Sequence, residues 1–238
     1  MFVAQNISTG FKKSNNKILH QSVNFELNNG DFMLLIGSNG IGKSTLLKTI
    51  LGIYPPLNGK FIFNNEDITF LQSRKKSKLI SMMLPNSPNI EIMSAFEVAM
   101  TGLNNQLKPW NSENQTMQNK LKFEFETAGI SQLINQKFAE LSDGEKQKVM
   151  LIRCLIQDTP ILLLDEPLAF LDYQSKIQFL NLLSSKCKNE NKIVVLSTHD
   201  LDVSLPFATK IFALKKTTFT FFENKDNFTL SDYLNETA

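Results

Sequence analysis

Arginine and cysteine are scarce in this sequence and long apolar runs are absent, and each shortage narrows the possible functions. Arginine occurs only at Arg74 and Arg153, and a net charge of +2 over 238 residues forms no basic stripe, so nucleic acid is not an expected partner. Cys154 and Cys187 lie far apart in helix-like sequence, which indicates neither a disulfide framework nor a metal cluster. No N-terminal signal is visible, and no apolar run reaches the ~18 residues of a membrane span, so we expect a cytoplasmic protein.

The apolar residues that are present predict an α/β fold. A hydrophobic share of 42% is ordinary for a globular domain, and 238 residues can bury a core. Alternation of apolar and polar residues over 1–27 predicts antiparallel strands with one solvated face. Continuous apolar runs predict buried strands at 32–36, 160–167 and 192–198, with another strand at 79–84. Aromatic alternation after residue 210 predicts edge strands.

The middle of the chain has a helical character instead. From about residue 90 to 150 apolar residues recur at helical spacing, first at Ala95, Val98 and Ala99 and later at Leu121 and Phe125. The polar segment 104–119 reads as a loop, and an amphipathic helix is predicted at 173–185. We therefore predict a single domain, 1–238, with an α/β core at about 1–88 and 151–238 and an inserted helical subdomain at about 89–150.

A glycine-rich loop joins the strand at 32–36 to a helix predicted at 45–51, and the rest of the chain is organised around it. The loop fits the pattern G-x-x-x-x-G-K-[ST], and Gly52 closes the helix. A strand, a glycine turn and a helix N-terminus aim N–H groups at one point, which binds phosphate. Lys43 can then reach the β- and γ-phosphates, and the Ser44 hydroxyl can ligate Mg²⁺. The predicted nucleotide-binding residues are Gly37, Ser38, Asn39, Gly40, Ile41, Gly42, Lys43, Ser44 and Thr45.

Acidic residues and a histidine follow two of the predicted buried strands. Ligands of a parallel sheet sit at the carboxyl ends of its strands, so Asp165, Glu166 and His199 should meet the glycine-rich loop at one edge. Asp165 suits Mg²⁺, and Glu166 suits a general base that orients water against the γ-phosphate. His199 either senses the γ-phosphate or is a satisfied structural histidine.

The segment Leu141-Ser142-Asp143-Gly144-Glu145 precedes another predicted helix. Its N-terminus can accept phosphate. Ser142 and Glu145 also fit a capping box, which would make the segment an ordinary helix start. Both interpretations can hold together.

With these motifs in this order, the chain resembles the ATP-binding subunits of ABC transporters over nearly its whole length. Residues 37–45 match the Walker A loop, 141–145 resemble the LSGGQ signature, and 161–167 match Walker B with its glutamate. Segments 170–172 and 197–200 are similar to the D-loop and the switch histidine. Within the family, residues 100–103, a loop ending near Trp110 and residues 157–167 resemble the importers of iron–siderophore, haem or cobalamin type.

The resemblance implies a P-loop NTPase fold with a RecA-like core, an N-terminal antiparallel β part and an inserted helical subdomain. It implies ATP hydrolysis in a head-to-tail dimer, with each ATP between the Walker loop of one copy and the signature of the other. It places Ser142, Asp143 and Gly144 on that ATP and Phe11 on its adenine. It also implies a polytopic permease partner, a substrate-binding protein upstream, and a peripheral place on the inner face of the cell membrane.

Three positions depart from the family pattern. Asp143 stands where a second glycine is usual and Glu145 where glutamine is usual, and Asp143 adds a negative charge near phosphate that must be offset. Asn86 occupies the Q-loop position, where glutamine is usual. It keeps the amide but is one methylene shorter, which puts its contact with Mg²⁺ or the attacking water in doubt.

The leading hypothesis is an ATPase that energises an importer of an iron complex (siderophore, haem) or of cobalamin. A soluble ABC ATPase of the iron–sulfur assembly type is the alternative. The signature and His199 argue against a third class, an unrelated P-loop kinase. Neighbouring genes for a permease and a lipoprotein binding protein would separate the first two classes.

Overall fold

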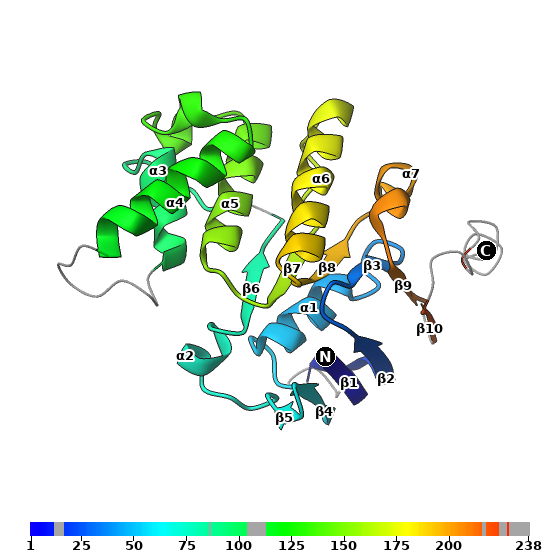
Figure 1. The fold of residues 1–238 in the computed structure, drawn as a ribbon. Helices are drawn as coiled ribbons and strands as arrows, with labels where there is room; N and C mark the ends of the chain where they lie inside the picture. The colour runs from blue at the N-terminus through cyan, green and yellow to red at the C-terminus, as the bar shows by residue number, and fades with distance from the viewer. Residues whose placement is uncertain (12–16, 86, 104–112, 216–217, 224–227, 229–238) are drawn as a thin grey trace.

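The structure of the chain is a computed structural model that describes residues 1–11, 17–85, 87–103, 113–215, 218–223 and 228, with the backbone alone at 113 and 114. It contains two sheets with helices around them (Figure 1). Within these residues, no helix combines the length and the apolarity that crossing a bilayer requires.

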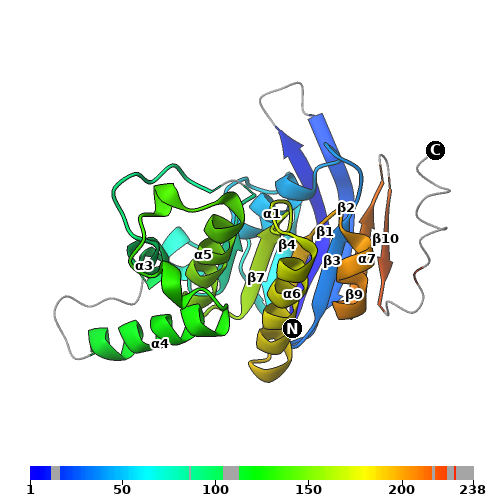
Figure 2. The same cartoon turned by 90° about the horizontal axis from the view of Figure 1, so that it is seen from above.

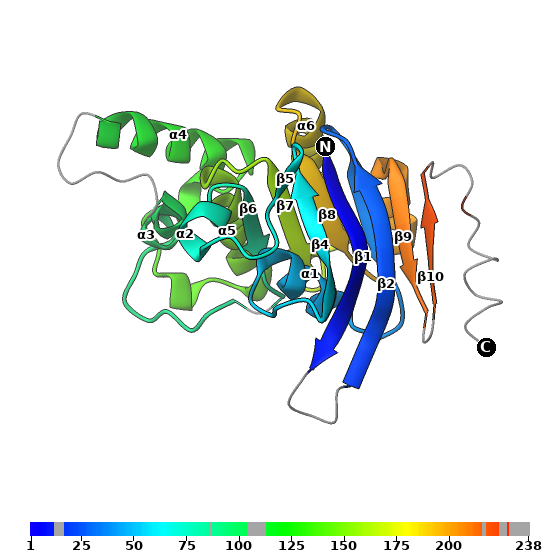
Figure 3. The same cartoon turned by 90° about the horizontal axis from the view of Figure 1, so that it is seen from below.

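The smaller sheet is antiparallel and is built from the N-terminal part of the chain, as the alternating pattern predicts. Its strand order is β2-β1-β4-β5. One face buries aromatic side chains, among them Phe2, Phe25 and Phe61. Figure 3 shows these strands side by side. The strands are β1 (Phe2–Phe11), β2 (Lys17–Leu27), β4 (Asn58–Phe63) and β5 (Glu66–Asp67).

The larger sheet has the strand order β10-β9-β3-β8-β7-β6, and every pairing except that of β10 with β9 is parallel. Every residue of β3, β7 and β8 is buried, which confirms what the continuous apolar runs predict. The prediction of edge strands after residue 210 is wrong for β9, which lies inside the sheet between β3 and β10 because its apolar residues are buried there. The strands are β3 (Phe32–Ile36), β6 (Ile80–Met83), β7 (Ile161–Asp165), β8 (Ile193–Ser197), β9 (Lys210–Leu214) and β10 (Phe219–Phe222).

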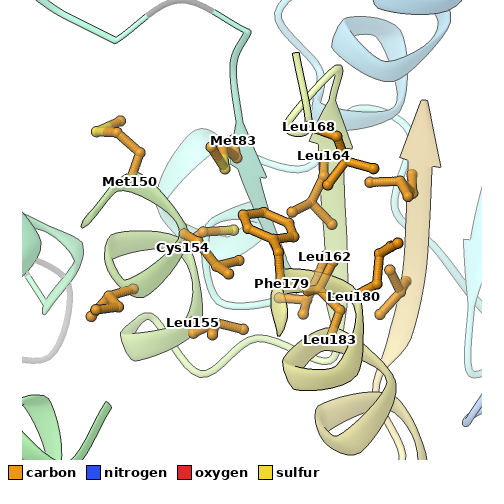
Figure 4. Packing of buried hydrophobic residues seen from close by; sticks show 14 of the residues in the cluster. Met83, Met150, Cys154, Leu155, Leu162, Leu164, Leu168, Phe179, Leu180 and Leu183 are labelled. Atoms are coloured by element: carbon orange, nitrogen blue, oxygen red, sulfur yellow. The ribbon is translucent and has the colours of Figure 1, made fainter. Parts of the chain in front are cut away.

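Alternate residues of the larger sheet enter two different cores. Met33, Leu35 and Leu163 face the core that the small sheet shares with α1 (Lys43–Leu51). Leu34 and Leu164 face the second core, on the opposite side of the sheet. In the second core, α5 (Asp143–Ile156) and α6 (Tyr173–Asn189) pack against β6 and β7 (Figure 4). The larger sheet is thus covered on both faces, as parallel sheets require.

The helices α3 (Ala95–Met100), α4 (Glu113–Thr127) and α5 lie together beside the sheets (Figures 1 and 2). The expectation of a loop over 104–119 is wrong for residues 113–119, which begin α4; residues 104–112 lie outside the described residues. The helix forms because Leu121 and Phe125 bury one of its sides, while most of its described polar residues are exposed and the buried Glu124 pairs with Lys186. α5 passes through the predicted boundary at residue 150, and α6 extends past the predicted end at residue 185.

Shorter helical segments account for the remaining helices among the described residues. The remaining α-helices there are α2 (Ser73–Lys76) and α7 (Leu201–Ser204). Single 3₁₀ turns lie at Thr101–Leu103, Ser131–Leu133, Phe138–Glu140 and Leu205–Phe207.

Candidate functional site

The glycine-rich loop at residues 37–45, called the phosphate loop below, runs from the end of β3 into the first turn of α1. Gly42 is the N-cap of α1 with φ +111°, and Gly40 has φ +74°, conformations that side-chain-bearing residues rarely adopt. A Cβ on Gly42 would lie 2.6 Å from Cε1 of His20, so the close packing at this point also requires glycine. The first turn of α1 carries no acidic residue, which leaves its positive dipole end available for an anion.

Lys43 is almost fully buried and lies at the centre of the site, with 6% of its side chain exposed. Its Nζ donates to the Gly37 carbonyl at 2.8 Å and lies 3.0 Å from His199 Nε2. The same Nζ lies 3.4 Å from Glu166 Oε1, which is itself 3.0 Å from His199 Nε2. Burial lowers the pKa of Lys43, and attraction to Glu166 opposes that shift. The structure therefore brings together the lysine, glutamate and histidine that the sequence places at one edge.

Asp165 ends β7 with no exposed surface. Its Oδ1 accepts a hydrogen bond from Ser197 Oγ at 2.8 Å, whereas its buried Oδ2 has no hydrogen-bond partner among the described residues. An unpartnered carboxylate oxygen is a fitting ligand for a hard cation. In the described part of the chain, no group of three or more His, Cys, Asp or Glu side chains is arranged so that it could hold a metal ion by itself. The donor set fits Mg²⁺, which binds through one or two protein oxygens and fills its shell with phosphate and water.

Glu166 has φ +49°, a conformation that is costly for a residue with a side chain. Its backbone N–H is held by Ser197, through the carbonyl oxygen at 3.2 Å and Oγ at 3.0 Å. Ser197 thus fixes both acidic residues, and sequence analysis missed this role. The only sequence signal for it is that Ser197 ends a buried strand two positions before His199.

The segment 141–145, called the signature segment below, begins α5. Ser142 is the N-cap, its Oγ accepts from Glu145 N–H at 3.3 Å, and Glu145 Oε2 accepts from Ser142 N–H at 2.9 Å. The predicted capping box is confirmed, and a carboxylate in place of glutamine makes it equally well. Asp143 is exposed with Lys146 at 3.9 Å, which offsets its charge only weakly. Among the described residues, no hydrogen bond or ion pair joins the signature segment to the phosphate loop.

Phe11 ends β1 with 38% of its surface exposed, so part of its side chain is accessible. Its ring and that of Tyr54 meet edge to face, with ring centroids 5.6 Å apart and an interplanar angle of 78°. Tyr54 is not among the residues that the sequence motifs predict. Asn86, the predicted Q-loop residue, lies outside the described residues. The carbonyl of its neighbour Pro85 accepts a hydrogen bond from the buried Gln147 of α5 at 3.1 Å.

Comparison with known proteins supports the same assignment. The family model "ABC transporter" matches residues 20–169. The achromobactin transport ATP-binding protein of Dickeya dadantii is 30% identical over 200 residues, covering 83% of this chain and 73% of the relative. The molybdate import ATP-binding protein of Haemophilus influenzae is 31% identical over 217 residues, covering 91% and 81%. A solved metal-chelate type ABC transporter in an inward-facing conformation superposes with TM-score 0.83 and 25% identity, covering 99% of this chain and 88% of that one.

Proposed function

This chain belongs to the ABC transporter family as an ATP-binding subunit that hydrolyses ATP for transport, and on that premise we propose which residues act and what is carried. The convergence of Lys43, Glu166 and His199 beside the unpartnered Oδ2 of Asp165 carries the proposal. Phosphate binding needs the lysine, general-base catalysis needs the carboxylate, and a cation needs the free oxygen.

When nucleotide binds, the ammonium group of Lys43 exchanges its partner Glu166 for a phosphate. Its ammonium group lies between Glu166 and the Gly37 carbonyl, at the N-terminus of α1 where the β- and γ-phosphates would lie. A phosphate that takes the ammonium group leaves the Glu166 carboxylate free to accept a proton from the attacking water. Ser44 and Asp165 would hold Mg²⁺, which when bound would neutralise phosphate charge. His199, 45% exposed, can still turn towards the γ-phosphate.

A second copy of the chain completes the site in this proposal. Among the residues that the structure describes, no hydrogen bond or ion pair joins the signature segment to the phosphate loop, and Ser142 and Asp143 at the start of α5 are exposed. A head-to-tail dimer would place Ser142, Asp143 and Gly144 of one copy over the phosphate held by the other. Phe11 would stack on adenine, and Asn86 would couple the site to the permease with a weakened contact.

We further propose the partner and the cargo. The helical segment 89–150 would face a polytopic permease, which holds the chain at the inner face of the membrane. Relatives are named for achromobactin, for molybdate and for phosphonates, and the similar solved transporter is of metal-chelate type. The achromobactin and metal-chelate names support a chelated metal, and on that support we propose an iron complex over cobalamin.

Uptake measurements in cells that lack this chain test the cargo. We expect the loss of ferric-siderophore or haem uptake, restored by the wild-type chain and not by Lys43→Ala at equal protein level. Loss of molybdate uptake with normal uptake of iron complexes would refute the iron proposal while leaving the ATPase assignment intact. Normal uptake of every cargo tested, together with impaired iron–sulfur enzymes, would favour the soluble alternative.

A further inference from the structure

His20 is a buried titratable residue beside the phosphate loop. It has no role in the ATP hydrolysis proposed above. It lies on β2 with 5% of its surface exposed. Its Nδ1 is 2.9 Å from the hydroxyl oxygen of Thr9, a residue of β1 with no exposed surface. The other ring nitrogen, Nε2, is also buried and makes no well-directed hydrogen bond among the described residues.

The free edge of this ring lies against the N-cap of α1. A Cβ on Gly42 would lie 2.6 Å from Cε1 and 3.2 Å from Nε2 of His20, so the imidazole fills the space that a side chain would take. The regular pairing of β1 with β2 is interrupted on both sides of Thr9, and Ser22 has φ +55°. Such bulges re-aim side chains out of the regular alternation.

We propose that His20 is a positioning residue for nucleotide binding. Its ring packs against Gly42 and keeps the phosphate loop in its binding conformation. The inference rests on the proposed role of that loop. Lys43 follows Gly42 directly, so a shift of Gly42 moves the lysine and the first N–H groups of α1 together. Thr9 fixes the orientation of the ring through Nδ1.

The ring acts as a neutral support and not as a phosphate ligand. Burial lowers the pKa of His20 from its usual value, and a contact with the Ile41 backbone only partly opposes that shift, so the site favours the neutral ring. Its Nε2 is covered by the protein and does not reach the surface on which phosphate would bind. The nucleotide would feel His20 only through the backbone of the loop.

Loss of this support has a distinctive kinetic consequence. A loop that adopts the binding conformation for only a fraction of the time raises the apparent Kd by the inverse of that fraction. Bound nucleotide then holds the loop in place, so turnover at saturation changes little. If the loop without the ring holds the binding conformation for about 1–10% of the time, the apparent Kd rises by about ten- to a hundredfold. We therefore expect His20→Ala to raise the KM and Kd for ATP, and the Kd for ADP, by about that factor, with kcat within about threefold of wild type.

The matched control is Val23→Ala. Val23 is a fully buried residue of the same strand that packs in the core shared by the two sheets. Both variants should lower the melting temperature, but only His20→Ala should weaken nucleotide binding. Thr9→Val removes the hydroxyl that orients the ring and should raise the KM by a smaller factor, whereas His20→Gln, which refills part of the space, should recover part of the lost affinity.

The outcomes separate the inference from the proposed function. Wild-type ATP affinity in folded Lys43→Ala would refute the phosphate loop as the binding site. Loss of binding in Lys43→Ala, with His20→Ala no weaker in ATP binding than Val23→Ala, would refute the role of His20 alone. Should His20→Ala fail to fold, the same comparison is made with Thr9→Val, and an unchanged KM in that variant overturns the proposal.

Discussion

Replacing Glu166 by glutamine removes the proposed general base and leaves the shape of the site almost unchanged. Glu166 Oε1 lies 3.4 Å from Lys43 Nζ and 3.0 Å from His199 Nε2, and an amide oxygen can occupy the same place. General-base catalysis is typically worth 10²–10⁴-fold, so we expect kcat to fall by about that factor.

The same change should strengthen ATP binding. Two unit charges 3.4 Å apart attract by roughly 5 kcal/mol at an effective dielectric of 20, but solvation and screening reduce the net value of such pairs to about 1 kcal/mol. ATP must displace Glu166 from Lys43 in the wild type and has no charge to displace in the variant. The expected gain in affinity is about fivefold.

Phosphate release and calorimetry on the same preparations measure the two effects. Glu190→Gln is the control, because Glu190 also pairs with lysines, Lys186 and Lys192, but at the end of α6. It should leave kcat and ATP affinity unchanged. Wild-type turnover in folded Glu166→Gln would refute its role as base and make His199 the next candidate.

The remaining predictions concern adenine, the coupling residue and acid stability. Phe11→Ala should weaken ATP binding roughly ten- to a hundredfold, since base stacking is worth about 1–3 kcal/mol, and Phe11→Tyr should not; equal affinities by calorimetry would make Phe11 a packing residue only. Asn86→Ala should lower transport, and Asn86→Gln should restore or raise it; if neither changes hydrolysis or transport, the Q-loop assignment is wrong. Burial alone would raise the pKa of Asp158, but hydrogen bonds from Lys120 and Lys192 outweigh it and lower the pKa from 3.8 to about 2. The stability that Asp158 adds, about 1 kcal/mol for this 45% exposed group, is present above pH 3.8 and is lost as the pH falls through about 2. The gap in melting temperature between wild type and Asp158→Asn should therefore close over that range, and a constant gap would contradict the assigned pKa.

The sequence predicts those parts of the fold in which the local residue pattern is compatible with only one structure. Strands β3, β7 and β8 are apolar at nearly every position because both faces of the sheet are covered there. The phosphate loop was predictable because Gly40 and Gly42 adopt positive φ, so its glycine spacing follows from the backbone.

The parts of the fold and site that the sequence did not predict depend on tertiary contacts. The start of α4 is rich in asparagine and glutamine, and the helix forms there because Leu121 and Phe125 anchor it in the core. β9 is an interior strand because β3 and β10 pair with it, which aromatic alternation alone does not reveal. His20 and Ser197 act through contacts with residues distant in sequence, so no local motif marks them.

The central claim is that each ATP is bound by the phosphate loop of one copy and completed by the signature segment of another. Calorimetry of ATP binding at low protein concentration, compared with hydrolysis of the same samples at high concentration, tests it most directly. Lys43→Ala should lose both binding and hydrolysis, whereas Ser142→Arg should keep the affinity of a wild-type monomer and lose hydrolysis, because its bulk obstructs only the closure of a dimer. Loss of ATP binding by monomeric Ser142→Arg, or wild-type binding by folded Lys43→Ala, would contradict the shared site.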